Sequence, residues 1–154
     1  MTQKRQDRLP ALERELTGAI ISAFYFCYNE LGFGFLESVY RRALTIELRL
    51  RGFHIVEEAL VEAMFRGVQV GTYRLDLLVE HRVVVEVKAT AALGPADKRQ
   101  LLNYLRASNL EVGLLLHFGP EPVIHRLSRT NPSRSAQAAL PARGTDPAVP
   151  ASSD

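Results

Sequence analysis

Apolar residues recur at intervals of three and four over two stretches near the start of the chain, which predicts two amphipathic helices. The first helix is predicted from Ala11 to Leu31, because Gly32 is suited to end it. The second is predicted from about Leu36 to Arg51. Its core-facing residues are expected to be Val39, Ala43, Leu44, Ile46 and Leu50.

The pattern then changes to short runs rich in Val, Leu and Ile, which are typical of strands. A break at Gly94-Pro95 precedes one more helical pattern, and an unalternated apolar run follows it, as expected of a strand covered on both faces. The predicted elements are strands at 53–58 and 60–65, a hairpin of 74–79 with 83–88, a helix at 96–107, a strand at 112–116 and an edge strand at 122–127. This order predicts an α/β (α+β) protein whose mixed sheet is flanked by helices.

The predicted hairpin carries charges in an otherwise apolar stretch. If its two strands pair about His81, Asp76 lies directly opposite Glu86. Two like charges that face each other destabilise a sheet, but a bound divalent cation would turn that cost into a gain. Lys88 lies two residues further along on the same face. On the other face the register pairs Leu75 with Val87, Leu77 with Val85 and Val79 with Val83.

A simpler interpretation of these charges remains open. On a solvated sheet face, Asp76 would reach Lys88 and Glu86 would reach Arg74 along the diagonals. Exposed ion pairs of this kind contribute only about 0 to 1 kcal/mol each. The hairpin alone therefore predicts either a cation site or a charged lattice.

Composition and length limit the alternatives. With 154 residues and 47% hydrophobic content, the chain suffices for one folded domain, predicted at 11–129. We expect a flexible N-terminus at 1–10 and a disordered tail, rich in Pro, Ala and Ser, at 130–154. A single cysteine, Cys27, excludes a disulfide within the chain and a cysteine-based metal site, and it fits a reducing cytoplasm. No apolar run approaches the ~18 residues of a membrane span, so no membrane association is expected.

Two further groups are candidates for chemistry. Glu37 falls in the first turn of the second helix, where acidic residues are favoured and where Arg41 can pair with it. Gln100 and Tyr104 are four apart on the polar side of the third predicted helix. A solvated helix face explains them equally well, although an amide and a phenol ring also suit contact with a nucleotide.

In combination, the motifs Gly34-x-x-Glu37-x-x-Tyr40, Asp76, Glu86-Val87-Lys88 and Gln100-x-x-x-Tyr104 resemble the GxxExxY protein family of the PD-(D/E)XK nuclease superfamily. The last motif resembles the Gln-x-x-x-Tyr helix of RecB-like nucleases. The resemblance extends over about 16–127. One departure is Leu75, which stands where the superfamily motif has proline before the aspartate.

The resemblance implies a restriction-endonuclease-like core in αβββαβ order, with Mg²⁺ as cofactor and Mn²⁺ as a possible substitute. The implied metal ligands are Asp76, Glu86, Glu37 and the backbone carbonyl of Val87. The implied catalytic residues are Lys88, Glu37, Asp76, Glu86 and Gln100, and the implied substrate-binding residues are Tyr104, Gln100, Arg41 and Arg99.

The function that the resemblance implies is that of a metal-dependent nuclease, and we expect a cytoplasmic deoxyribonuclease that hydrolyses phosphodiester bonds in DNA. Its partner is nucleic acid, and a protein partner is compatible with the sequence. The alternative is a catalytically silent module that binds nucleic acid or protein within a nucleic-acid-processing complex. A structural adaptor with a salt-bridged sheet ranks last.

Overall fold

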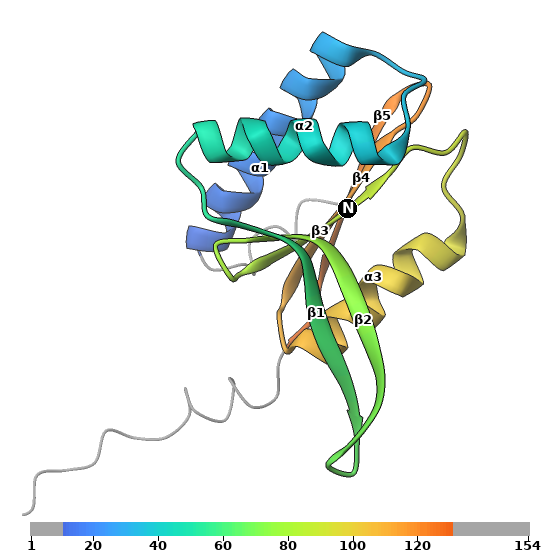
Figure 1. Ribbon diagram of the computed structural model, residues 1–154. Helices are drawn as coiled ribbons and strands as arrows, with labels where there is room; N and C mark the ends of the chain where they lie inside the picture. Colours follow the sequence, from blue (N-terminus) through green and yellow to red (C-terminus); the bar gives the residue numbers. More distant parts are fainter. Residues whose placement is uncertain (1–10, 131–154) are drawn as a thin grey trace, which may run out of the picture.

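The computed structural model describes residues 11–130, so the predictions for the flexible N-terminus and for the tail beyond residue 130 lie outside the described residues. Five strands form one mixed sheet in the order β1-β2-β3-β4-β5 (Figure 1). β3 and β4 run parallel, and the other neighbouring strands are antiparallel. The strands are β1 (Ile55–Phe65), β2 (Val68–Val79), β3 (Val83–Lys88), β4 (Val112–Phe118) and β5 (Pro122–Ser128).

Helices cover both faces of the sheet. α1 (Ala11–Leu31) and α2 (Glu37–Leu50) pack on one face, and α3 (Pro95–Ser108) packs on the other. α3 connects β3 to β4, and such a crossover is what allows two consecutive strands to run parallel. The predicted mixed sheet flanked by helices, with α2-β1-β2-β3-α3-β4 in αβββαβ order, is confirmed.

The predicted elements agree with the structure except between 53 and 73. The strand predicted at 74–79 begins earlier, at Val68, because its first half continues the pairing with β1. The two short strands predicted at 53–58 and 60–65 are one strand, β1, and the prediction of a break between them is wrong. The cause lies at Glu58, whose φ of +51° interrupts the alternation of apolar and polar side chains without ending the pairing with β2. A kinked strand and two separate strands leave the same sequence pattern.

The core-facing side of α2 also differs from the prediction. Its buried apolar side chains are Tyr40, Leu44 and Leu48, which recur every four residues and therefore form one stripe. Val39, Ile46 and Leu50 were expected in the core, but their side chains are exposed. The apolar residues of α2 cover more than half of its circumference, and packing against α1 and the sheet selects only one side of it.

The predicted hairpin forms with the predicted register, since Leu77 pairs with Val85 and Val79 pairs with Val83. One part of that prediction is wrong, because Leu75 does not share the core of Leu77 and Val79. It packs against α3 in the cluster on the opposite face of the sheet. The exchange of faces occurs at the position of Glu58, where the left-handed backbone rotates both strands of the β1–β2 pair. The charged segment of β2 lies at this point of rotation.

Cys27 lies in the core between α1 and the sheet. Burial, with a smaller contribution from the carboxylate of Glu47, raises the pKa of its thiol to about 11. A thiol with a raised pKa is a poor nucleophile, so its interpretation as a small core hydrophobe is confirmed. Within residues 11–130, no helix is long and apolar enough to cross a membrane.

Candidate active site

One carboxylate on β2 and one on β3 each accept a hydrogen bond from a backbone amide of the opposite strand. The amide of Asp76 donates to Oε1 of Glu86 at 3.2 Å, and the amide of Val87 donates to Oδ2 of Asp76 at 2.8 Å. The regular backbone pairing of β2 with β3 ends at Leu77 and Val85, one residue before these carboxylates. Each side chain therefore satisfies an amide that the separating strands leave unpaired, and the two acids are held side by side.

Glu86 is the more deeply buried of the two, with only 4% of its surface exposed. Burial, and next the negative charge of Asp76, raise the pKa of Glu86 to about 8. The hydrogen bond from the Asp76 amide and the charge of Lys88 act in the opposite direction and do not cancel these effects. A buried carboxyl group beside a second carboxylate is costly to ionise, and a cation between them would relieve that cost.

Lys88 ends β3 beside these acids and connects them to α3. Its Nζ donates to Oε1 of Gln100 at 3.0 Å and lies 3.8 Å from Oδ1 of Asp97. Nε2 of Gln100 donates to the hydroxyl of Tyr104 at 2.8 Å. The Gln-x-x-x-Tyr pair therefore acts as a chain of hydrogen bonds that fixes the lysine ammonium group.

Glu37 begins α2 and is held there by the turn that precedes it. Gly34 has a φ of +115°, which favours glycine, and Tyr40 donates its hydroxyl hydrogen to the Gly32 carbonyl while accepting from the Phe35 amide. Tyr40 is fully buried, so it belongs to the core and not to its edge. Burial and the nearby Asp76 raise the pKa of Glu37, which shows that its carboxyl group lies in the field of the same acidic pair.

Replacing Tyr40 by Phe is expected to lower the free energy of unfolding by about 0.5 to 1.5 kcal/mol. The ring would remain stacked on Phe118, at 4.3 Å between centroids, but the partly buried Gly32 carbonyl and the Phe35 amide would lose their partner. Denaturant unfolding of the variant and the parent measures the difference. Equal stabilities would show that water satisfies the turn and that the hydroxyl does not hold it.

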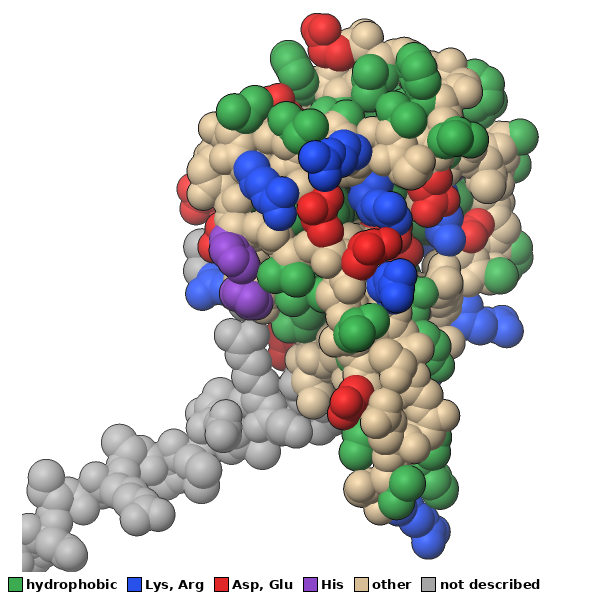
Figure 2. All heavy atoms as spheres, viewed as in Figure 1, with side chains coloured by type: hydrophobic (Ala, Val, Ile, Leu, Met, Phe, Trp, Pro, Cys, Tyr) green, Lys and Arg blue, Asp and Glu red, His purple; other side chains and the backbone are tan. Residues whose placement is uncertain are grey.

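Arg41 on α2 is the cation that faces Asp76. Its guanidinium group lies 3.8 Å from Oδ1 of Asp76 and 3.8 Å from Oε1 of Glu58, while Arg74 lies 3.7 Å from the same Glu58 oxygen. The diagonal lattice predicted from sequence is wrong in its pairing, since Arg74 meets Glu58 and Lys88 meets Asp97. Figure 2 shows basic and acidic side chains interspersed over α2 and the adjacent part of the β1–β2 hairpin.

The donor set can be tested against the implied Mg²⁺. Among the described residues, no group of three or more His, Cys, Asp and Glu side chains is arranged to hold a metal ion. Two carboxylates are adjacent, however, and Mg²⁺ in phosphate-processing sites usually takes one or two carboxylates together with water and substrate oxygens. The Asp76 and Glu86 pair, with the Val87 carbonyl on the same strand, therefore fits Mg²⁺ in its donor chemistry.

Arg99 and Tyr104 occupy the α3 side of the site, beside a cavity of about 290 Å³. Tyr104 has only 7% of its surface exposed, so a role as a substrate contact stays a prediction. Glu58 and Tyr73 belong to none of the sequence motifs, although both lie beside the site. The acidic pair at 57 and 58 within an apolar strand was a usable signal for Glu58, and Tyr73 has no motif of its own.

Known proteins resemble this chain in sequence pattern and in fold. A sequence model described as the PD-(D/E)XK nuclease superfamily matches residues 14–129, and no curated protein matches the chain. The crystal structure of SSO0001 resembles the chain with a TM-score of 0.50 and 18% sequence identity, over 64% of this chain and 53% of that chain. The chain thus spans about half the length of that protein, and the likeness supports the fold. With the family match over nearly all of the described residues, the chain belongs to the PD-(D/E)XK nuclease superfamily.

Proposed function

We propose that the chain is a Mg²⁺-dependent nuclease that hydrolyses phosphodiester bonds in DNA, and that within its superfamily it is a GxxExxY protein. The observation that carries this proposal is the interlocked pair of Asp76 and Glu86 beside Lys88. Such a buried acidic pair costs stability in the absence of a cation, so a structural role alone does not account for it. Glu37, Asp97 and Gln100 surround the same point.

Each side chain has a defined task in this proposal. Asp76, Glu86 and the Val87 carbonyl would hold the metal ion, with Glu37 reaching it from α2. When bound, the metal supplies polarisation of the phosphodiester and a water of lowered pKa. Lys88, oriented by Gln100, places a positive charge where negative charge develops on the phosphate.

Arginines supply the remaining electrostatics. Arg41 now neutralises part of the charge on Asp76 and Glu58, and it lies where an incoming phosphate would compete for it. Arg99 on α3 would contact the DNA backbone on the other side of the site. Contacts of this type position a nucleic acid without reading its sequence.

Labelled single-stranded and double-stranded DNA, incubated with the parent protein and with Lys88→Ala, tests the proposal. Cleavage by the parent is expected in Mg²⁺ or Mn²⁺ and not in chelator, and the variant should lose at least about 100-fold of that rate. Arg82→Ala, which removes a positive charge from the β2–β3 turn, is the matched control. Equal rates for Lys88→Ala and the parent would exclude this site as the source of cleavage.

A second candidate function, a silent binding module, is favoured by one observation. Both oxygens of Asp76 already have partners, namely the Val87 amide and Arg41, as in a site that has exchanged a metal for an arginine. This function predicts DNA or protein binding that Lys88→Ala does not change. No cleavage of either DNA by a folded parent protein that binds divalent metal would favour it over the nuclease.

A further inference from the structure

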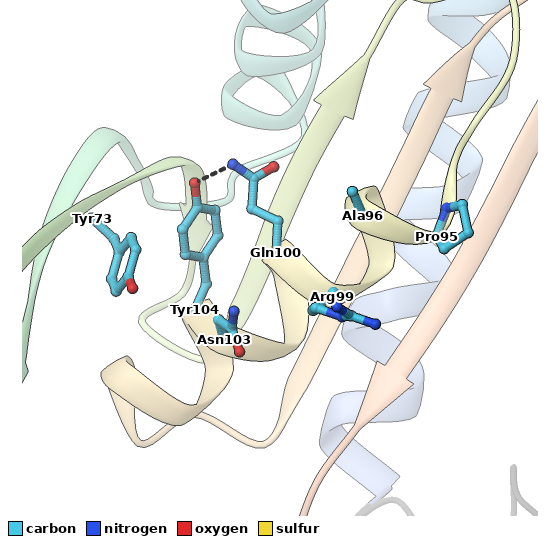
Figure 3. Close-up of a pocket in the computed structure, with 7 residues that line it drawn as sticks. All are labelled: Tyr73, Pro95, Ala96, Arg99, Gln100, Asn103 and Tyr104. Atoms are coloured by element: carbon cyan, nitrogen blue, oxygen red, sulfur yellow. Dashed lines mark hydrogen bonds between the residues drawn. The ribbon is translucent and has the colours of Figure 1, made fainter.

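The cavity beside the candidate active site has an aromatic wall and a polar wall. It measures about 290 Å³ and lies between the side chain of Tyr73 on β2 and the first three turns of α3. Figure 3 shows the rings of Tyr73 and Tyr104 side by side, Gln100 reaching the Tyr104 hydroxyl, and Arg99 directed away from the two rings. The cavity therefore combines ring surface, an amide and a nearby cation.

The two tyrosines differ in what they can offer a ligand. Their ring centroids are 5.4 Å apart and the rings are inclined by 58°, so a flat ligand does not fit between them. Tyr104 is almost fully buried and its hydroxyl is bonded to Gln100, whereas 38% of Tyr73 is exposed. Tyr104 supports Tyr73 from one side, and the open surface of the Tyr73 ring is available for stacking.

Asn103 supplies the polar edge of the same cavity. Its exposed side chain carries two donors and one acceptor, the complement needed by the Watson–Crick edge of a base. Aromatic stacking with an adjacent hydrogen-bonding amide is the usual way in which proteins hold unpaired bases. A stacked base pair cannot enter, because both faces of its bases are covered by their neighbours.

Gln100 connects this cavity to the acidic pair. It lines the cavity and also accepts a hydrogen bond from Lys88, which ends the strand that carries Glu86. A base in the cavity and a phosphate beside Lys88 are thus separated by one side chain. That separation suits the base and phosphate of neighbouring positions on one strand.

We propose that the cavity between Tyr73 and α3 binds an unpaired nucleobase of the DNA, with stacking on Tyr73 and edge contacts from Asn103. The assignment rests on the proposed function, because the base in the cavity would belong to the same DNA strand as the phosphate beside Lys88. It adds the substrate class: the site acts on a single strand or an unpaired end rather than on continuous duplex.

Binding without turnover tests the assignment. A single-stranded oligonucleotide carrying a fluorescent adenine analogue is titrated in chelator with the parent, Tyr73→Leu, Tyr73→Phe and, as matched control, Tyr25→Leu on α1, where the tyrosine is also partly exposed. Tyr73→Leu is expected to weaken binding about 5- to 150-fold and to abolish quenching of the analogue, since stacking contributes about 1 to 3 kcal/mol per base. Tyr73→Phe and Tyr25→Leu should bind and quench as the parent does.

The outcomes separate this assignment from the proposed function. Unchanged binding and quenching by a folded Tyr73→Leu, or equal affinity of the parent for a duplex of the same sequence, would overturn the base-binding cavity even if the parent cleaves DNA. Loss of affinity in Tyr73→Leu with no cleavage by the parent would support the cavity and refute the nuclease. Circular dichroism of each variant establishes that it is folded.

Discussion

Asp76→Asn is expected to abolish metal-dependent cleavage, with a loss of at least about 100-fold relative to the parent. Asn retains an oxygen that can accept the hydrogen bond from the Val87 amide at the 2.8 Å position, so the joint between β2 and β3 is kept. What is lost is the negative charge that would hold the cation. The variant therefore tests the negative charge of Asp76 while the hydrogen bond between the two strands is kept.

Initial rates of cleavage over a series of Mg²⁺ concentrations measure this effect. Glu15→Gln, which removes one exposed carboxylate on α1, is the matched control and should cleave as the parent does. The midpoint temperature of thermal unfolding of Asp76→Asn in chelator should equal or exceed that of the parent, because the negative charge beside the buried Glu86 is gone. Full cleavage by a folded Asp76→Asn would contradict the assignment of this residue.

The second large effect concerns Glu86 and the dependence of stability on pH. Burial and the Asp76 carboxylate raise its pKa from an ordinary value of 4.5 to about 8. Between these values the folded protein retains a proton that the unfolded chain has released, so the free energy of unfolding falls as pH rises. The slope for one proton is about 1.4 kcal/mol per pH unit. This contribution is fully present below 4.5 and is lost as pH rises through about 8.

Glu86→Gln should remove most of this slope, because the amide has no proton to release and its oxygen can still accept from the Asp76 amide. Glu37 contributes in the same direction, since its pKa is also raised, so a smaller slope remains. Denaturant unfolding in chelator between about pH 5 and about pH 8 measures the slopes. Parallel curves for the parent and Glu86→Gln would show that Glu86 ionises freely in the folded protein.

Divalent metal should oppose the loss of stability that accompanies a rise in pH. A cation favours the ionised carboxylate, so Mg²⁺ is expected to stabilise the parent more at about pH 8 than at about pH 5, by linkage between metal and proton binding. Glu86→Gln should show little of this gain. Stabilisation of both proteins to the same extent would place the metal outside this pair.

Local sequence patterns determined the register of the β2–β3 hairpin and the bounds of two helices. The register that pairs Leu77 with Val85 follows from apolar alternation about a short polar turn, and φ values near +52° at Glu80 and His81 form that turn. The bounds of α1 and α3 follow from helical periodicity and from Gly32 and Pro95 at their ends. These features depend on contacts between residues close in sequence, so the sequence alone specifies them.

The tertiary structure decided what depends on contacts between distant segments. The left-handed backbone at Glu58 turns Leu75 to the opposite face from Leu77, and no alternation pattern reveals that rotation. Which side of α2 is buried was set by α1 and the sheet, because its apolar residues exceed one stripe.

The candidate site shows the same division. Sequence order and spacing identified Asp76, Glu86 and Lys88, because a charged triplet is conspicuous in apolar strands. The partners of these residues come from two other segments: Arg41 from α2 pairs with Asp76, and Gln100 from α3 accepts from Lys88. Such partners are selected by packing and by the desolvation of charges in three dimensions, quantities that local sequence does not contain. The sequence by itself thus determined which acidic and basic side chains stand in the candidate site, and the tertiary structure decided their neighbours, their electrostatics and the cavity beside them.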